Sequence, residues 1–171
     1  MISSSEKFNI RYTELQDEPF LRKWVQESLS WFSIETGKEL EEQLKIWMGY
    51  ARFKCSLTAT YEGKPCGVAT LFLFPYVKLL HQSMGYIVVD PGSRRQGVGR
   101  ALVRNLDHLA ESYFRLERMH YEVYGENPLR KLLIEQGYKE LFEQKHFVKE
   151  GELYLSRFVL EKKYNPLPRR V

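Results

Sequence analysis

The chain has 171 residues, of which 43% are hydrophobic and 28% are charged, and its formal net charge is +4. This length and composition exclude a low-complexity protein and favour one globular domain over residues 1–171, with a sizeable buried core. No apolar run approaches the roughly 20 residues that cross a membrane, and the N-terminus lacks the apolar segment of a signal peptide. We therefore expect a cytoplasmic protein that binds no membrane.

The cysteines and histidines predict neither a disulfide nor a metal site. Cys55 and Cys66 flank one predicted hairpin turn at unequal distances, so their side chains should not face each other. We expect two buried, reduced thiols. The four histidines are scattered without the spacing of metal ligands. The mild positive charge suits an anionic small ligand as well as a nucleic acid, and it identifies neither.

The N-terminal part of the chain predicts a strand, two helices and a pair of strands. Residues 8–12 alternate as a strand does. Residues 19–51 carry apolar side chains at three- and four-residue steps, which predicts helix, with a break at Gly37. Residues 55–74, CSLTATYEGKPCGVATLFLF, indicate a strand, a turn around Gly63 and a second strand.

The rest of the chain continues with a strand and a long helix. Residues 83–90, SMGYIVVD, form a nearly continuous apolar run, which is typical of a buried strand. Pro91 and Gly92 end it, and a helix with an apolar stripe follows. The stripe consists of Leu102, Leu106, Leu109 and Tyr113.

Four shorter elements complete the order. A strand at 119–124 precedes a short helix at 127–138, which has Gly137 near its C-terminal end, where glycine is favoured. Two strands, near 139–148 and 153–161, end the pattern. The order βααβββαβαββ predicts an α/β (α+β) arrangement whose central unit is a strand, a loop and a helix.

The loop of that central unit, residues 90–101 (DPGSRRQGVGRA), places Arg94, Arg95 and Arg100 around two glycines at a helix start. A helix N-terminus is already electropositive, so each exposed basic residue there costs about 0.3–1 kcal/mol. A bound polyanion would offset this cost, because the first helical N–H groups have no partner within the helix and glycines let a ligand approach the backbone. The alternative is that the arginines are solvated surface charges and the glycines only turn the chain.

Two familiar phosphate-binding motifs do not fit this loop. A P-loop that begins at Gly92 requires Lys and then Ser or Thr, where Val98 and Gly99 stand. A dinucleotide-binding fingerprint that begins at Gly97 requires glycine where Leu102 stands. What remains is the pattern R-x-x-G-x-G between a strand and a helix.

The segment VVDPGSRRQGVGRALV resembles the acetyl-CoA-binding motif of the GNAT N-acetyltransferase superfamily, V-x-P-x-x-R-x-x-G-x-G followed by a small residue and an apolar helix. The matching positions are Val89, Pro91, Arg94, Gly97, Gly99, Ala101 and Leu102. Residues 61–74 and 122–141 are similar to further strands and to the last helix of the family. The resemblance covers about residues 56–160 and implies the GNAT fold, a mixed sheet of about six to seven strands with a splayed central pair and about four helices.

The same resemblance implies acetyl-CoA as co-substrate. The residues that it assigns to acetyl-CoA are Ile87, Val88, Val89, Arg94, Arg95, Gln96, Gly97, Val98, Gly99, Arg100 and Asn127. The strand 86–89 would part from its neighbour at a bulge and pair with the pantetheine arm. The N–H groups of residues 95–100 would hold the pyrophosphate, and an N–H near Val88 or Val89 would polarise the thioester carbonyl. Asn127 would contact the cofactor or the acceptor side of the cleft.

Members of this family often carry a tyrosine that protonates the departing thiolate, and this chain lacks it. Counting back from the Gly-Tyr pair of the last helix gives Leu133, and counting forward from Asn127 gives Ile134. A thiol pKa of about 8.5 means that the thiolate leaves with little help at neutral pH. Tyr124, Tyr138 or a water could serve as the acid, and Tyr138 is expected in the core.

A base is also needed, because an acceptor amine with a pKa of about 10 is mostly protonated at neutral pH. Glu122 is the candidate base, so that Glu122 and Tyr124 are the candidate catalytic residues. They share a strand face with His120, but alternation does not show which face looks toward the cleft. The alternative is a solvated or salt-bridged Glu122; Glu126 and His81 are weaker candidates for the base, and a water chain is a further route for the proton.

The N-terminal helices are unusually aromatic. Their large aromatic residues include Trp24, Trp31, Phe32, Trp47 and Tyr50. Their helical spacing predicts that most belong to the core. We expect one or two to line the acceptor entrance.

The resemblance implies an N-acetyltransferase that moves an acetyl group from acetyl-CoA to a primary amine by direct attack in a ternary complex. The expected acceptor is a small amine or amino acid, or a protein N-terminus. The alternative is a non-catalytic acyl-CoA-binding sensor or scaffold, which the absent tyrosine favours. A nucleic-acid partner is disfavoured, because the aromatic residues recur at core spacing rather than among exposed basic residues. The sequence leaves a homodimer open.

Overall fold

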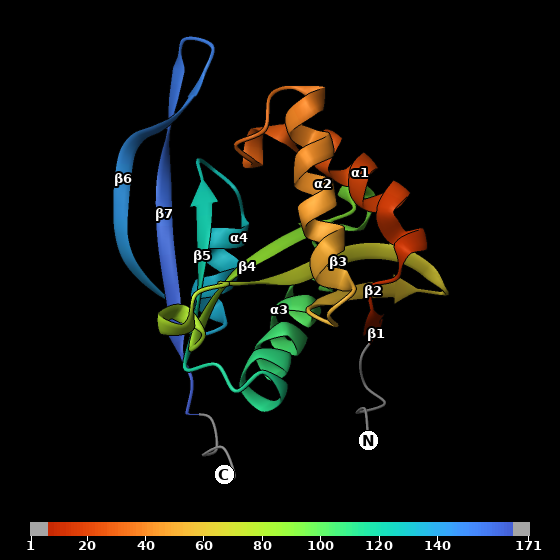
Figure 1. Ribbon diagram of the computed structural model, residues 1–171. Helices are drawn as coiled ribbons and strands as arrows, with labels where there is room; N and C mark the ends of the chain where they lie inside the picture. Colours follow the sequence, from red (N-terminus) through yellow and green to blue (C-terminus); the bar gives the residue numbers. More distant parts are fainter. Residues whose placement is uncertain (1–6, 166–171) are drawn as a thin grey trace.

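The computed structural model describes residues 7–165, which form one mixed seven-stranded sheet with helices on both faces (Figure 1). The strands are β1 (Asn9–Tyr12), β2 (Ser56–Tyr61), β3 (Lys64–Leu73), β4 (Gln82–Val89), β5 (Arg118–Tyr124), β6 (Lys139–Glu150) and β7 (Leu153–Lys163). Their order is β1-β2-β3-β4-β5-β7-β6, in which β4 and β5 run parallel and the other neighbours run antiparallel. The predicted order of elements is confirmed.

Four α-helices within residues 7–165 cover the sheet unevenly. They are α1 (Glu18–Gln26), α2 (Gly37–Ala51), α3 (Val98–His108) and α4 (Leu129–Glu135). Helices α1 and α2 pack on β2, β3 and β4, and they lie away from β6 and β7 (Figure 1). Helices α3 and α4 pack on the opposite face. None of the helices in the described part of the chain is long and apolar enough to cross a membrane.

Each face of the sheet has its own buried cluster. Under α1 and α2, the apolar side chains of the helices meet those of β3 and β4, as Trp47 and Val88 show. Under α3 and α4, the larger cluster includes Leu102, Leu106 and Leu133, all fully buried. The two clusters fix both helix layers to the sheet, so the loop between β4 and α3 is held from both sides.

The break between the two N-terminal helices lies earlier than the sequence predicts. Helix α1 ends at Gln26, and α2 begins at Gly37 itself, so Gly37 is a helical residue and not the break. Thr36 caps α2: its hydroxyl accepts a hydrogen bond from the Glu39 N–H at 3.2 Å, and the Glu39 carboxylate accepts one from the Thr36 N–H at 2.8 Å. This reciprocal capping box defines the helix start more strongly than a glycine does.

The predicted apolar stripe of α3 fails at its last member. Helix α3 ends at His108, and a π-helical turn occupies Leu109–Tyr113. A π turn has a longer repeat than an α-helix, so the residues after it leave the 3.6-residue period. Tyr113 is consequently 62% exposed, whereas Leu109 stays buried.

The cysteine prediction is confirmed. Cys55 and Cys66 are both buried and unpaired. Burial raises the pKa of each thiol to about 11, so both remain protonated at neutral pH. Within residues 7–165, no three or more His, Cys, Asp or Glu side chains gather in a group that could hold a metal ion.

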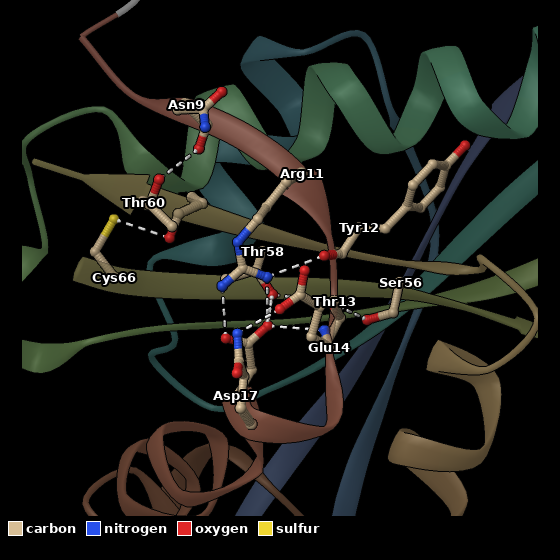
Figure 2. Close-up of polar contacts among 12 residues, drawn as sticks. Asn9, Arg11, Tyr12, Thr13, Glu14, Asp17, Ser56, Thr58, Thr60 and Cys66 are labelled. Atoms are coloured by element: carbon tan, nitrogen blue, oxygen red, sulfur yellow. Dashed lines mark hydrogen bonds and ion pairs between the residues drawn. The ribbon is translucent and has the colours of Figure 1, made fainter. Parts of the chain in front are cut away.

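A buried carboxylate joins β1 to the turn before α1 (Figure 2). Asp17 is 1% exposed and accepts two hydrogen bonds from Arg11, at 2.7 and 2.8 Å. It accepts two more, from the Glu14 N–H and from the Thr58 hydroxyl, both at 2.9 Å. Burial alone would raise the pKa of Asp17, but the hydrogen bonds from Arg11, Glu14 and Thr58 outweigh it and lower the pKa.

A chain of hydroxyls continues from Asp17 through the sheet to α2, and Figure 2 shows its first members, Thr58, Thr13 and Ser56. Thr58 lies 3.0 Å from Thr13, Thr13 lies 2.8 Å from Ser56, and Ser56 lies 2.6 Å from Thr70, each distance joining two hydroxyl oxygens. Trp47 donates its indole N–H to Thr70. The Thr58 hydroxyl has a single proton, and both Asp17 Oδ2 and the Thr13 oxygen lie within its reach as acceptors.

Candidate active site

The central strands β4 and β5 separate beyond a short stretch of pairing. Residues Gln82–Met84 of β4 pair in parallel with Arg118–His120 of β5, and the pairing ends there. At the next position, Gly85 has no side chain, and a Cβ there would overlap the ring of Tyr121. The buried Tyr121 ring therefore packs over Gly85 on the face covered by α3 and α4, at the point where the strand pairing ends. Beyond it, the β5 side of β4 has no strand partner within the described pairing.

This separation arises without the predicted bulge. The register of β4 against β3 is unbroken from Ser83 to Val89. The bulge that the family resemblance implies is therefore absent from the β3–β4 pair, and that expectation is wrong for this chain. The pairing of β4 with β5 thus ends after Met84 although β4 carries no extra residue against β3.

The hydrogen bonds of β3 show which β4 amides face the gap. The Asp90 N–H donates to the Cys66 carbonyl at 3.0 Å. Along an antiparallel pair, successive residues point their N–H groups alternately toward and away from the partner strand. The amide of Val88 therefore points toward β3, whereas those of Ile87 and Val89 point toward the open edge. Of the two amides that the sequence proposed for the thioester, that of Val89 has the suitable direction.

The loop after β4 depends on both glycines for different reasons. Gly97 stands at the N-terminus of α3 with φ of 98°, a conformation that strains residues with a side chain. Gly99 has ordinary angles, but a Cβ there would lie 3.0 Å from Leu132 Cδ2 of α4. Asp90 closes the preceding turn by accepting from the Gly92 N–H at 3.3 Å. The glycines thus bring α4 and the start of α3 into close contact.

A cavity of about 800 Å³ lies at this helix start. Its walls are formed by Trp31, Phe32, Ile87, Val88, Val89, Arg94, Arg95, Gly97, Gly99, Arg100, Glu126, Asn127, Pro128, Leu129 and Leu132. Nine of the eleven predicted acetyl-CoA residues are among them. The other two point their side chains elsewhere: Val98 is buried in the core, and Gln96 donates to the Gly92 carbonyl at 3.3 Å.

Two arginines of the loop, Arg94 and Arg100, differ in their contacts. Arg94 is half-buried: it donates to the Ser28 hydroxyl at 2.5 Å, and its guanidinium carbon lies 4.2 Å from the Trp31 ring centroid. Burial lowers the pKa of Arg94. Arg100 is exposed and forms an ion pair with Glu135 at 2.9 Å. Arg94 therefore brings a desolvated positive charge to the cavity wall, and its contacts tie the loop to the segment between α1 and α2.

Asn127 and the last helix close the far side of the cavity. The Asn127 side-chain oxygen accepts from the Leu129 N–H at 3.0 Å, so it caps the start of α4. Leu133, one of the two positions for the absent tyrosine, is fully buried, and Ile134, the other, is exposed. Neither lines the cavity, whereas Leu132 does. No residue at these positions replaces the missing acid.

The structure decides the face of β5 that the sequence left open. Met119, Tyr121 and Val123 are buried on the α3 and α4 side, so Glu122 and Tyr124 lie on the opposite face of the sheet. There the Tyr124 hydroxyl donates to Glu122 Oε2 at 3.2 Å. Neither residue belongs to the wall of the 800 Å³ cavity.

The neighbours of Glu122 set the protonation states on that face. Arg157 of β7 donates to Glu122 Oε1 at 3.0 Å. Burial, followed by the charge of Glu122, raises the pKa of Tyr124 far above its ordinary value, so this hydroxyl stays protonated. The same two causes raise the pKa of Tyr86 to about 12. Burial lowers the pKa of His120, so its imidazole is neutral at pH 7.

The other candidate acid belongs to the core, as expected. Tyr138 is buried and donates its hydroxyl to Asp107 of α3 at 2.5 Å, on the side away from Glu122. That one or two N-terminal aromatics line the acceptor entrance stays a prediction; Trp31 and Phe32 line the cavity at the start of α3. The sequence missed Arg157, which no local pattern connects with Glu122, because the pairing of β5 with β7 brings them together.

The geometry agrees with a family comparison. The model of the acetyltransferase (GNAT) family matches residues 15–138. The chain belongs to this family. No curated relative matches the sequence.

Solved GNAT structures share the architecture at low identity. A phosphinothricin acetyltransferase from Sinorhizobium meliloti, in complex with acetyl-CoA, superposes with a TM-score of 0.82 at 17% identity and covers 96% of this chain and 95% of its own. A ribosomal-protein-alanine N-acetyltransferase from Brucella melitensis gives 0.80 at 23%, covering 91% and 99%. The ribosomal-protein-S18-alanine N-acetyltransferase from Escherichia coli gives 0.74 at 17%, covering 96% and 98%. The predicted GNAT fold is confirmed.

Proposed function

We propose that this GNAT acetyltransferase moves the acetyl group of acetyl-CoA to a primary amine by direct attack in a ternary complex. The acceptor is a small amine or amino acid, or a protein N-terminus. The observation that carries the proposal is one cavity that joins the glycine-rich start of α3 to the open edge of β4. Two of the similar structures, from Sinorhizobium meliloti and Salmonella typhimurium, contain acetyl-CoA, which supports the choice of co-substrate.

The residues of the cavity fit the parts of acetyl-CoA. The N–H groups of residues 95–100 suit the pyrophosphate, because glycines leave the approach open and the first turn of a helix has unpaired donors. Arg94 and Arg95 supply positive charge at the same wall. The outward amides of Ile87 and Val89 suit the pantetheine arm and the thioester carbonyl. The thioester supplies an activated acetyl group, and an amide aimed at its oxygen stabilises the negative charge that develops there.

In the proposed reaction the amine nitrogen bonds to the acetyl carbon, and the bond from that carbon to sulfur breaks. The proton lost by the amine goes to Glu122, directly or through water, and coenzyme A leaves as a thiolate that takes up a proton. Tyr124 is the candidate donor of that proton, and its hydrogen bond to Glu122 lets it take back the proton that Glu122 accepted from the amine. Arg157 and Tyr124 hold the Glu122 carboxylate in place, which makes Glu122 a defined acceptor of the proton.

Glu122→Gln tests the base. We expect about a 100-fold lower rate at neutral pH, with the difference shrinking as pH rises, because hydroxide then deprotonates the amine without a base. Thiol release measured from pH 6 to pH 10 gives the profile. Glu143→Gln, at an exposed β6 carboxylate bonded to Ser156, is the control and should leave the profile unchanged. Parallel profiles for Glu122→Gln and the natural chain would remove Glu122 from this role.

Leu133 and Ile134 at the positions of the usual tyrosine favour a second candidate, a non-catalytic acyl-CoA sensor. The two functions give different results in one experiment. Calorimetry with acetyl-CoA measures binding, and thiol release against a panel of primary amines measures turnover. Binding together with turnover supports the enzyme, whereas binding without any turnover supports the sensor.

A further inference from the structure

The face of the sheet that carries Glu122 is covered only in part. Helices α1 and α2 pack there on β2, β3 and β4, the short 3-10 turn Leu29–Trp31 contacts β5, and none of the four described α-helices packs on this face of β5, β7 or β6 (Figure 1). We use the name platform for the six side chains His120, Glu122, Tyr124, Phe142, Phe147 and Arg157. They come from β5, β6 and β7.

Strand register places the platform residues on one face. Tyr124 pairs with Arg157, Arg157 pairs with Gln144, and Glu122 pairs with Val159, which in turn pairs with Phe142. Directly paired residues project from the same face of a sheet. The face is the one that continues from the separated ends of β4 and β5, where the proposed acetyl transfer takes place.

Phe147 reaches the platform through an irregularity in β6. Between Gln144 and Val148 the register shifts against β7, and His146 has φ of 55°. Bulges of this kind commonly re-aim a side chain next to a functional site. The Phe147 ring stacks on the Tyr124 ring with centroids 5.9 Å apart. Phe147 is 41% exposed, so part of its ring is accessible to a ligand.

The charges of the platform are already balanced. Arg157 donates one terminal nitrogen to Glu122 at 3.0 Å and the other to Gln144 Oε1 at 2.7 Å. Its guanidinium also lies 4.1 Å from the Phe147 ring centroid and 5.9 Å from that of Phe142. A carboxylate on the acceptor would have to displace these contacts to use Arg157. A polycation would find one carboxylate that an arginine has already neutralised.

The apolar part of the platform is small and exposed. Phe142 is 48% exposed and Phe147 is 41% exposed, and both rings flank the same guanidinium. Apolar residues gathered beside polar groups in an open site are typical of a ligand-binding surface. Two rings offer the area of one further ring or one short alkyl chain, which suits a small molecule better than an extended peptide.

We propose that the acceptor is a small primary amine carried on an aromatic or compact apolar group, without a carboxylate. This inference rests on the proposed function. The apolar group packs on Phe142 and Phe147, and the amine lies beside Glu122. Phe142 and Phe147 then determine specificity, and neither belongs to the wall of the cavity proposed for acetyl-CoA.

An acceptor panel at saturating acetyl-CoA tests the substrate class. 2-Phenylethylamine is compared with phenylalanine, which adds a carboxylate to the same skeleton, with spermidine, and with a tripeptide amide that begins with phenylalanine. We expect kcat/KM for 2-phenylethylamine to exceed the others by about tenfold or more. A higher value for any of the other three acceptors overturns the inference and leaves the proposed function standing. Acetyl-CoA binding without turnover of any amine removes both.

Phe147→Ala tests the platform directly. We expect KM for 2-phenylethylamine to rise about tenfold, because the ring loses a stacking partner, while KM for propylamine and the affinity for acetyl-CoA change little. Phe142→Ala should act in the same direction. Tyr154→Ala removes another exposed aromatic of the same hairpin and is the control. Equal losses for 2-phenylethylamine and propylamine, in variants with unchanged melting temperature, would contradict the assignment.

Discussion

Two half-buried arginines, Arg11 on β1 and Arg94 before α3, are satisfied in opposite ways. Arg11 donates both terminal nitrogens to Asp17, and that hydrogen bonding raises the pKa of its guanidinium. Arg94 contacts the Ser28 hydroxyl and the Trp31 ring, and burial lowers its pKa. An arginine that the fold itself requires receives a carboxylate. Arg94 meets an uncharged hydroxyl and a ring, and it thus keeps a charge that an anionic ligand can use.

Removing the carboxylate of Asp17, the partner of Arg11, should have the largest effect. Asp17→Ala leaves the Arg11 guanidinium and the end of the hydroxyl chain without their acceptor. We expect the free energy of unfolding to fall by about 3 kcal/mol, the low end for a broken buried pair, because Arg11 is 28% exposed. Urea unfolding measures this change. Acetyl-CoA affinity of the folded variant should stay unchanged.

The matched control for this prediction is the Arg22–Glu41 pair. Glu41 of α2 is 52% exposed, so its ion pair with Arg22 is screened by water. Glu41→Ala should leave the free energy of unfolding nearly unchanged. Similar losses for Asp17→Ala and Glu41→Ala would mean that the buried network is no more important than a surface pair.

Removing the charge of Arg94 should affect acetyl-CoA binding rather than the stability of the fold. Arg94→Leu keeps apolar contact with Trp31 but removes the positive charge from the cavity wall. We expect the Kd for acetyl-CoA to rise about 10- to 100-fold, the range for losing a hydrogen bond to a charged group. The melting temperature should change little, because Arg94 bonds to the uncharged Ser28 hydroxyl and its loss leaves no carboxylate without a partner. Calorimetry and thermal unfolding on the same sample separate the two effects.

The opposite outcome for Arg94→Leu is equally measurable. A large loss of stability with unchanged acetyl-CoA affinity would make Arg94 a structural arginine like Arg11. The contrast between the two regions would then disappear. The proposed pyrophosphate site would have to rest on the backbone amides of α3 alone.

The Arg-Gly loop can be predicted from the sequence better than the Asp17 network, because its residues are consecutive in the chain. The Arg-Gly loop occupies about a dozen consecutive residues, so its motif is visible in the sequence and includes five of the residues that line the cavity; the family resemblance supplied the other four predicted ones. The Asp17 network joins side chains from residues 11 to 70, and each of them alone is an ordinary polar residue. Its partners are set by strand register, which pairs Thr58 with Arg11 and Val68.

The catalytic face shows the same limit. Alternation puts Glu122 and Tyr124 together, but only the helices packed behind Tyr121 decide which way they point. Arg157 and Phe147 arrive from β7 and from an irregular part of β6, so no periodic pattern in the sequence connects them with Glu122. The exposure of Tyr113 could not be predicted either, because no apolar pattern in the sequence indicates a π turn.

The contribution of Asp17 to stability should also depend on pH. The folded pKa of Asp17 is lowered, so Asp17 stabilises the fold above its unfolded pKa of about 3.9, and this contribution is lost as pH falls through the folded pKa. We expect unfolding free energy to fall between pH 5 and pH 2, and Asp17→Asn to have a shallower dependence over the same interval. Urea titrations at four pH values give both slopes. Identical slopes would show that other carboxylates control acid stability.

The smallest effects should come from the exposed pair at the mouth of the cavity. Glu135 competes with a bound anion for Arg100, since the two side chains form an ion pair at 2.9 Å. Glu135→Gln should lower the Kd for acetyl-CoA by about twofold, and Arg100→Ala should raise it by about threefold, because exposed charges contribute little. Both changes should shrink in 0.5 M salt, whereas that of Arg94→Leu should persist, because a half-buried charge is screened less. Calorimetry at two salt concentrations checks the three variants together. A salt-resistant effect of Arg100→Ala, as large as that of Arg94→Leu, would mean that the ligand buries Arg100 and breaks its pair with Glu135.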